Sequence, residues 1–220
     1  MNAPSITRAM FLASLTGAAL FAAAPEALAA RNANAEAFVQ QSAQGALTAL
    51  AGGEAGQRNQ TFHTLMAQLA DMPRIANYVL GRYGGQLRAD AALRSEWNRT
   101  FQEYAIAVYE AQLDSYSNST LRVTGSTERV AGQDVIVMSE MTPRGGSRPL
   151  RVQWRVLRSG EVWKVVDVSL VYEGNEVWLA QQQQRDFLAQ LDRNNGDIRA
   201  LITSVRYMTQ RMRARVVART

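Results

Sequence analysis

The stretch that most constrains the fold runs from Leu150 to Gly174, with the sequence LRVQWRVLRSGEVWKVVDVSLVYEG. In its first half, apolar residues alternate with Arg151, Gln153 and Arg155, which is the period of two expected of a β-strand with one buried and one solvated face. Ser159-Gly160 then separates this run from a second apolar run, and glycine accepts the positive φ that a tight hairpin turn requires. We therefore predict a β-hairpin here.

The second strand of this hairpin, Val162 to Val171, is apolar on both faces except at Lys164, Asp167 and Ser169. A strand that is apolar on both sides usually has other elements packed on both faces. For Asp167 we consider two roles: a buried acid whose raised pKa serves catalysis, or a carboxylate that pairs with an arginine or caps a neighbouring backbone group. We favour the second role, because buried charges are normally paired.

Two further strands are predicted upstream, over residues 121–130 and 134–141, and no crossover helix separates any of the four strands. Short connections of this kind predict an antiparallel meander. Helical periodicity precedes and follows the strands, which indicates the α+β class: a twisted antiparallel sheet of about four strands, covered by N- and C-terminal helices. The expected helices cover residues 34–51, 57–70, 71–81, 91–116, 175–191 and a last segment from 198. We predict Asp71, Asp90 and Asn175 as the N-caps of the helices that begin beside them.

The first thirty residues have the character of a secretory signal peptide. Arg8 precedes the apolar run Ala9 to Ala24, and Ala27-Leu28-Ala29 is a small-x-small cleavage site. We predict a signal peptide over residues 1–29 and a soluble, exported mature protein, which in a bacterium with two membranes means a periplasmic one. The chain has no cysteine, so thiol catalysis, cysteine metal sites and disulfides are excluded.

The positive charge of the chain is concentrated at its C-terminal end. The net charge is +5, but Ala30 to Val205 holds 18 basic and 18 acidic residues, whereas the last fifteen residues hold five arginines and no acid. A nucleic-acid-binding surface would spread basic charge over a folded face, so we predict no nucleic-acid partner. We divide the mature chain into one domain, residues 30–205, and a basic tail, residues 206–220. This tail either solubilises the chain end or assists docking to anionic lipid or an acidic partner.

Motifs of catalysis and cofactor binding are missing from the sequence. His63 is the single histidine, and one histidine cannot form a metal-ligand set. There is no GxSxG elbow, no phosphate-binding glycine-rich loop and no dinucleotide fingerprint. We predict that the protein is not an enzyme and that it uses no cofactor and no metal.

Several blocks of the sequence resemble the MlaC (toluene-tolerance) family of periplasmic phospholipid-binding proteins. The block from Phe62 to Tyr83, FHTLMAQLADMPRIANYVLGRY, is similar to the family's F…L…D…IA…LG(R) block. The segment Trp163 to Val168, WKVVDV, resembles the family's WKVYDV strand, and Glu173-Gly174 falls where the family has a strand-ending Glu-Gly. An aromatic helix and the closing helices also match, through Trp97, Phe101, Tyr104, Tyr109, Leu113, Tyr116, Gln184, Arg185, Phe187, Leu201 and Ile202.

The resemblance implies a soluble shuttle that carries phospholipid between the outer and inner membranes. Its implied partners are an outer-membrane lipoprotein complex and an inner-membrane ABC transporter complex, with transient contact at the membrane surface. The acyl chains would lie in an apolar cavity between the sheet and the helices. Our candidate lining residues are Ile75, Val79, Leu80, Tyr104, Val108, Met138, Leu150, Val152 and Trp154.

Three other interpretations stay open from the sequence. Where the family usually has a small aliphatic residue and a serine, this chain has Asn175-Glu176-Val177-Trp178, so the ligand could be another membrane lipid, such as a hopanoid-type lipid. The same scaffold could carry an enzyme that uses Asp167 with a nearby tyrosine. The chain could also be an interaction module whose apolar faces all close into a dry core.

Overall fold

The computed structural model of the chain describes residues 30–51, 55–113, 116, 119–145, 149–172 and 174–217. The predicted signal peptide, residues 1–29, lies outside the described residues. The described helices, in chain order, are α1 (Ala33–Ala51), α2 (Ala55–Leu69), α3 (Met72–Tyr78), the 3₁₀ turn η1 (Gly81–Gly85), α4 (Gln86–Ala89), α5 (Ala91–Leu113), α6 (Leu179–Arg193) and α7 (Ile198–Val217).

The strands form one open antiparallel sheet in the order β1-β2-β3-β4-β5. They are β1 (Thr120–Val130), β2 (Asp134–Thr142), β3 (Leu150–Ser159), β4 (Val162–Tyr172) and β5 (Asn175–Trp178). The predicted hairpin is β3–β4, and Gly160 adopts the positive φ of +61° that its turn requires. The α+β class and the antiparallel meander are confirmed, with five strands where we predicted about four.

The fifth strand overturns one expectation from the sequence. We predicted that Asn175 caps a helix, whereas Asn175–Trp178 pairs with the end of β4 and α6 begins only at Leu179. Four residues are too few for a hydrophobic period to be visible, so tertiary pairing and not local pattern decides this segment.

A β-bulge explains why apolar residues occupy both odd-numbered and even-numbered positions of β4. Val156 of β3 pairs with Val165 and the preceding Arg155 pairs with Asp167, so Val166 is an extra residue in β4. The bulge reverses the alternation, because a one-residue insertion moves all later side chains to the other face. Trp163 and Val165 before the bulge therefore face the same side of the sheet as Val168 and Leu170 after it.

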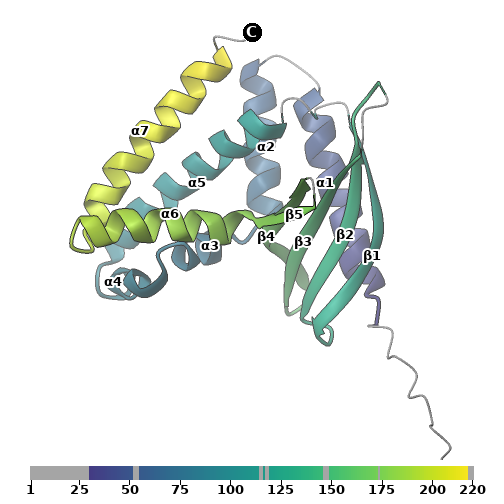
Figure 1. Cartoon of the computed structure of the whole chain (residues 1–220), viewed down its shortest axis with the longest axis horizontal. Coiled ribbons are helices and arrows are strands. Elements are labelled where there is room, and N and C mark those ends of the chain that lie inside the picture. Colours follow the sequence, from purple (N-terminus) through teal and green to yellow (C-terminus); the bar gives the residue numbers. More distant parts are fainter. Residues whose placement is uncertain are drawn as a thin grey trace, which may run out of the picture.

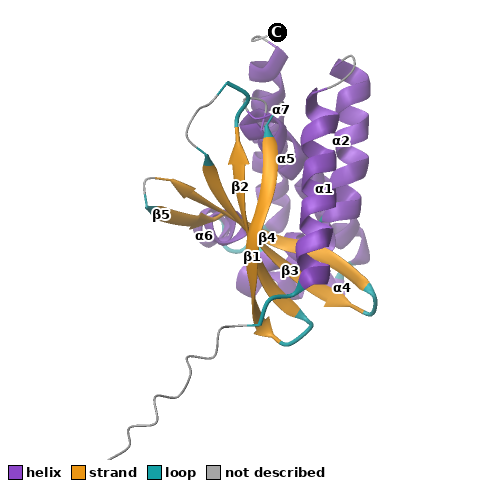
Figure 2. Ribbon diagram, turned by 90° about the vertical axis from the view of Figure 1, so that its right-hand side faces the viewer, coloured by secondary structure: helices purple, strands orange, loops and turns teal. Residues whose placement is uncertain are grey.

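Helix α1 covers the inner face of the sheet and protects its β1 edge (Figure 2). Gln40 accepts a hydrogen bond from the Val123 backbone N–H (2.9 Å) and donates one to the Leu121 carbonyl (2.9 Å). Gln44 accepts from the Leu121 N–H (2.9 Å). These side chains satisfy backbone groups that an edge strand would otherwise present to other chains.

The helices α3, α5, α6 and α7 form a second layer beside the sheet, with α6 running back from β5 beneath α5 (Figure 1). Phe187 of α6 packs against Trp97, Phe101 and Tyr104 of α5, with ring centroids 5.8, 6.4 and 5.8 Å away. The indole N–H of Trp97 donates to the Ala76 carbonyl of α3 at 2.7 Å. This aromatic cluster joins three helices, and all its rings are buried.

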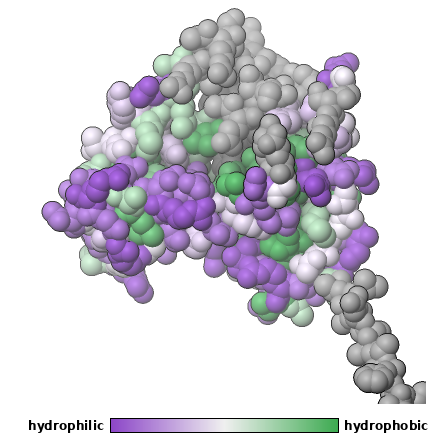
Figure 3. Space-filling view, in the orientation of Figure 1, coloured by the Kyte–Doolittle hydropathy of each residue, from purple (hydrophilic) through white to green (hydrophobic). Residues whose placement is uncertain are grey.

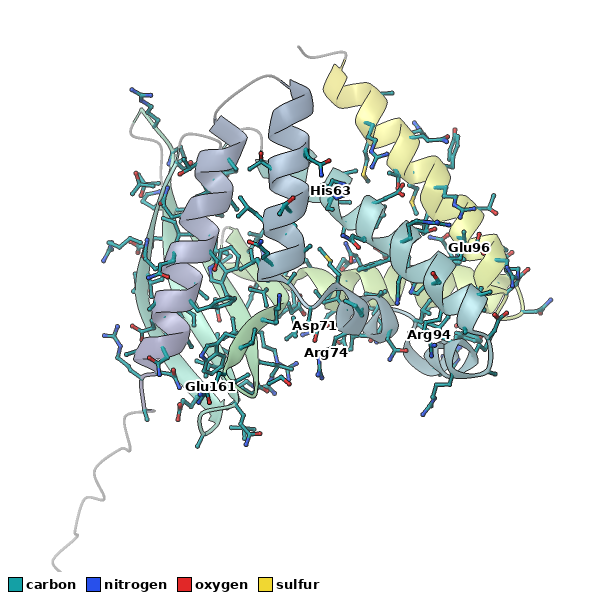
Figure 4. All side chains as sticks on the ribbon, turned by 180° about the vertical axis from the view of Figure 1, so that it is seen from behind. His63, Asp71, Arg74, Arg94, Glu96 and Glu161 are labelled. Carbon is teal, nitrogen blue, oxygen red and sulfur yellow. The ribbon has the colours of Figure 1, made fainter. Side chains whose placement is uncertain are left out.

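The arginines of the C-terminal segment belong to a helix that continues past residue 205. Helix α7 lies against α5, and Arg199, Arg206 and Arg213 are spaced seven residues apart along it. Arg199 and Arg206 pair with Glu96 of α5 at 3.1 and 2.9 Å, and Arg213 lies 4.0 Å from Glu103. Figure 4 shows Glu96 on α5 beside α7. The boundary that we placed after Val205 therefore lies inside a helix, and part of the basic charge there is paired within the chain.

Two glycines are expected to respond in opposite directions to substitution by alanine. Gly45 lies inside α1, and an added Cβ would meet nothing within 4 Å, so Gly45→Ala should raise the free energy of unfolding by about 0.5–1 kcal/mol.

Gly196 has a φ of +77°, and a Cβ there would lie 2.5 Å from the Tyr83 ring, so Gly196→Ala should lower the free energy of unfolding. Urea unfolding of both variants checks the two signs, and a loss of stability in Gly45→Ala would contradict the helix packing described.

Candidate functional site

An apolar cavity of about 100 Å³ lies between the inner face of the sheet and the helices. In Figure 3, which has the orientation of Figure 1, hydrophobic surface gathers near the centre of the molecule, between the helical layer and the sheet, while much of the helical surface on this face is hydrophilic. The cavity wall is formed by Ala43, Ala46, Leu47, Met66, Leu69, Ala70, Met72, Ile75, Phe101, Ala105, Tyr116, Leu121, Met141, Leu150, Val152, Trp154, Val165, Val166, Asp167, Val168, Leu170, Leu179 and Ala180.

Four of our nine candidate residues belong to this wall. They are Ile75 at the centre of α3, and Leu150, Val152 and Trp154 on β3. The three β3 residues share one face of the strand, as their spacing of two predicts. The indole N–H of Trp154 donates a hydrogen bond to Ser139 Oγ at 2.9 Å. The one polar group of this side chain therefore has a partner within the protein.

The other five candidates lie outside the wall. Met138 pairs with Gln153, on the sheet face opposite to the Val137–Trp154 pair, so it faces away from the cavity. On α5 the wall residues are Phe101 and Ala105. Tyr104 is rotated roughly 100° around the helix from Ala105, and Val108 lies about one turn beyond Ala105. Val79 and Leu80 follow α3 and are fully buried in the core without reaching the cavity.

Sequence reasoning missed the contributions of α1, α2 and β4 to the wall. Leu47 of α1 is an apolar residue of the wall, but the sequence gives no sign that its helix face borders a cavity instead of packed core. In β4 the bulge hides which residues face inward, so Val168 and Leu170 could not be selected by alternation.

Asp167 is the only charged side chain among the described residues of the cavity wall. Its Oδ1 accepts hydrogen bonds from the backbone N–H of Ala180 (2.8 Å) and of Val168 (2.9 Å). Burial raises the pKa of this carboxyl above 3.8, and the backbone N–H groups and the charge of Arg155 oppose that rise. The preferred role, a carboxylate that caps neighbouring backbone, is confirmed by these hydrogen bonds.

The raised pKa of Asp167 predicts an unusual pH dependence of stability. A carboxyl whose folded-state pKa lies above its unfolded value contributes stability that is fully present below the unfolded pKa, and that is lost as the pH rises through the folded pKa. Asp167→Asn removes this titration, while Arg155 and its partner Asp134 stay in place. The free energy of unfolding of the native chain, relative to Asp167→Asn, should therefore fall as the pH rises from the ordinary carboxyl pKa of 3.8 through the higher folded-state pKa. Urea titrations at several pH values measure it, and a relative stability that rises with pH would contradict the burial.

The single histidine of the chain lies outside the cavity wall. His63 lies half-buried on α2, and burial lowers its pKa (Figure 4). Among the described residues no three His, Cys, Asp or Glu side chains are close enough together to hold a metal ion.

Known proteins share the sequence pattern and the fold of this chain. The family model described as "MlaC protein" matches residues 40–207. This chain belongs to the MlaC family. The matched segment of this MlaC-family chain contains every residue of the cavity wall and ends within α7.

A solved structure shares the fold of this MlaC-family chain. It is the phospholipid-binding protein from Ralstonia solanacearum in complex with a phospholipid, with a TM-score of 0.68 and 22% sequence identity. The alignment covers 81% of this chain and 98% of that chain. A comparison with curated protein sequences found no match. No helix among the described residues combines the length and the apolar character needed to cross a membrane.

Proposed function

We propose that this MlaC-family chain is a periplasmic lipid carrier, which binds a phospholipid by its acyl chains and carries it between the outer and inner membranes. The observation that carries the proposal is the cavity wall, in which every described residue except Asp167 is uncharged. The Ralstonia solanacearum protein with the same fold was solved with a phospholipid, which supports the same class of ligand here.

The energetics favour such a cavity for lipid over any small polar ligand. A phospholipid that crosses water must hide several hundred Å² of acyl-chain surface, which is worth on the order of 10 kcal/mol at about 25 cal/mol per Å². A polar head group does not gain from this wall and would lie near solvent. We propose Ile75, Leu150, Val152 and Trp154 as lipid contacts, together with the inward residues of α1 and β4 that share the wall.

The size of the cavity adds a condition to the proposal. Its volume of about 100 Å³ is smaller than an apolar cavity of about 150 Å³ that takes up benzene. An acyl chain is several times larger than benzene, so loading requires the helical wall and the sheet to separate. In this proposal, the arrangement described here is the closed form of the carrier.

The proposed location and partners follow from the family and the N-terminal segment. Residues 1–29 would direct export as a cleaved signal peptide, and the mature chain would exchange lipid with an outer-membrane lipoprotein complex and an inner-membrane ABC transporter complex. An enzymatic role for Asp167 is less well supported, because its carboxylate already accepts the N–H groups of Ala180 and Val168. The described wall holds no second carboxyl and no imidazole group, and its one tyrosine is Tyr116.

Transfer between vesicles tests the carrier function. Donor vesicles with fluorescent phospholipid and unlabelled acceptor vesicles are separated by a membrane that passes only the protein, and the mature chain is added. We expect label to appear in the acceptors in proportion to protein concentration. Label that moves only when a hopanoid-type lipid replaces the phospholipid would reassign the ligand, and no movement of either lipid would contradict the proposal.

A further inference from the structure

Two oppositely charged side chains of β4 flank its bulge, and each contacts the end of a different helix. Lys164 and Asp167 stand three residues apart, on the two sides of the bulge residue Val166. Lys164 is the only lysine in a chain with 24 basic residues. The two helix ends that they contact, the C-terminus of α2 and the N-terminus of α6, both contribute residues to the cavity wall.

Lys164 holds the end of α2. Its ammonium Nζ donates to the Ala67 carbonyl at 3.3 Å and to the Gln68 carbonyl. These carbonyls belong to the last turn of α2, where the helix leaves acceptors without partners and carries partial negative charge. The next residues continue the attachment, since the Asp71 N–H donates to the Val165 carbonyl at 2.9 Å.

Asp167 holds the start of α6. The residue at the N-cap position, Trp178, makes no capping hydrogen bond with its side chain. The acceptor comes instead from β4, because Asp167 Oδ1 accepts from the Ala180 N–H at 2.8 Å in a buried position. The carboxylate of a neighbouring strand thus replaces the missing local cap and fastens the first turn of α6 to the sheet.

The geometry points to a shared role: Lys164 and Asp167 are positioning residues that hold the α2 and α6 walls of the cavity against the β4 bulge. Met66, Leu69 and Ala70 line the cavity at the end that Lys164 holds, and Leu179 and Ala180 line it at the end that Asp167 holds. The inference rests on the proposed function, in which lipid enters only when these walls separate. The strength of the two attachments then sets how fast lipid enters and leaves.

Hydrogen exchange of backbone amides tests the attachments without any lipid. In Asp167→Ala the Ala180 amide should exchange on the order of 5- to 10-fold faster than in the native chain, as expected for a lost helix cap. Asp167→Asn keeps an acceptor oxygen, so its exchange should stay within about twofold of native. Lys164→Met should speed exchange at Ala70 and Asp71. Native exchange rates in Asp167→Ala, or equal acceleration in the Ala and Asn variants, would overturn the inference.

Lipid release is the second readout, with Asp192→Ala as the matched control. Asp192 lies near the other end of α6, where it contacts Arg82 and Tyr83 at the exposed surface away from the cavity wall. Protein loaded with fluorescent phospholipid and mixed with unlabelled vesicles should lose label 5- to 10-fold faster in Asp167→Ala and at the native rate in Asp192→Ala. Equal release from all variants, together with the expected exchange changes, would overturn the role in the cavity. A native chain that takes up no lipid would defeat the proposed function, and hydrogen exchange would still decide the attachments.

Discussion

Filling the cavity from α5 is expected to reduce phospholipid uptake by more than tenfold. Ala105 is buried on the inner face of α5 and borders the cavity one helical turn after Phe101. In Ala105→Phe the new ring occupies space that at least three methylene groups of an acyl chain would use. At about 0.8 kcal/mol for each buried methylene, this removes roughly 2.4 kcal/mol of binding. Phospholipid bound after incubation with vesicles, quantified per mole of folded protein, measures the effect.

Ile136→Phe is the control for this prediction. Ile136 pairs with Arg155 and Thr127 on the sheet face that points away from the cavity. The same aromatic ring there should leave lipid uptake within about twofold of native, as expected for a partly exposed site remote from the ligand. Equal loss of uptake in both variants, or full uptake in Ala105→Phe, would place the lipid elsewhere in the molecule.

Phe187→Ala is expected to give the largest loss of stability, about 3–5 kcal/mol. Phe187 is 1% exposed and packs against three aromatic rings of α5. Its removal leaves a cavity that the surrounding rigid rings cannot collapse to fill. Because α6 also closes the lipid cavity through Leu179 and Ala180, the variant should retain lipid poorly as well. The midpoint of urea unfolding, monitored by tryptophan fluorescence, measures the loss.

A surface aromatic residue provides the comparison for Phe187. Tyr207 on α7 is 61% exposed, so Tyr207→Ala should change the free energy of unfolding by no more than about 0.5 kcal/mol. If the two variants unfolded at the same urea concentration, the packing of α6 on α5 described here would be wrong.

Sequence periodicity was most informative where backbone geometry is regular. The alternation in β3 correctly placed Leu150, Val152 and Trp154 on one face, and that face borders the cavity. Asp71 and Asp90 were correctly predicted as helix N-caps, since their side chains accept from the N–H groups of Arg74 and Leu93. Both successes depend on local interactions between residues that are close in sequence.

Tertiary effects limited the prediction elsewhere. The bulge at Val166 changes which residues of β4 point to the inner face of the sheet, and no local sequence pattern predicts this bulge. On α5 the wall contains Ala105 and not the neighbouring Tyr104 that we selected. Aromatic content alone cannot fix the rotation of a helix, because aromatic residues also fill the core. The cap that Asp167 provides joins residues 13 positions apart, so only the folded chain shows which helix it holds.

The central claim is that the cavity between sheet and helices carries phospholipid. Mass spectrometry of the intact, natively purified mature chain, followed by a second spectrum after incubation of delipidated protein with phospholipid vesicles, tests it most directly. We predict a complex whose added mass equals bound phospholipid, regained after delipidation and strongly reduced in Ala105→Phe. A native chain that appears only at its own mass in both spectra would contradict the claim.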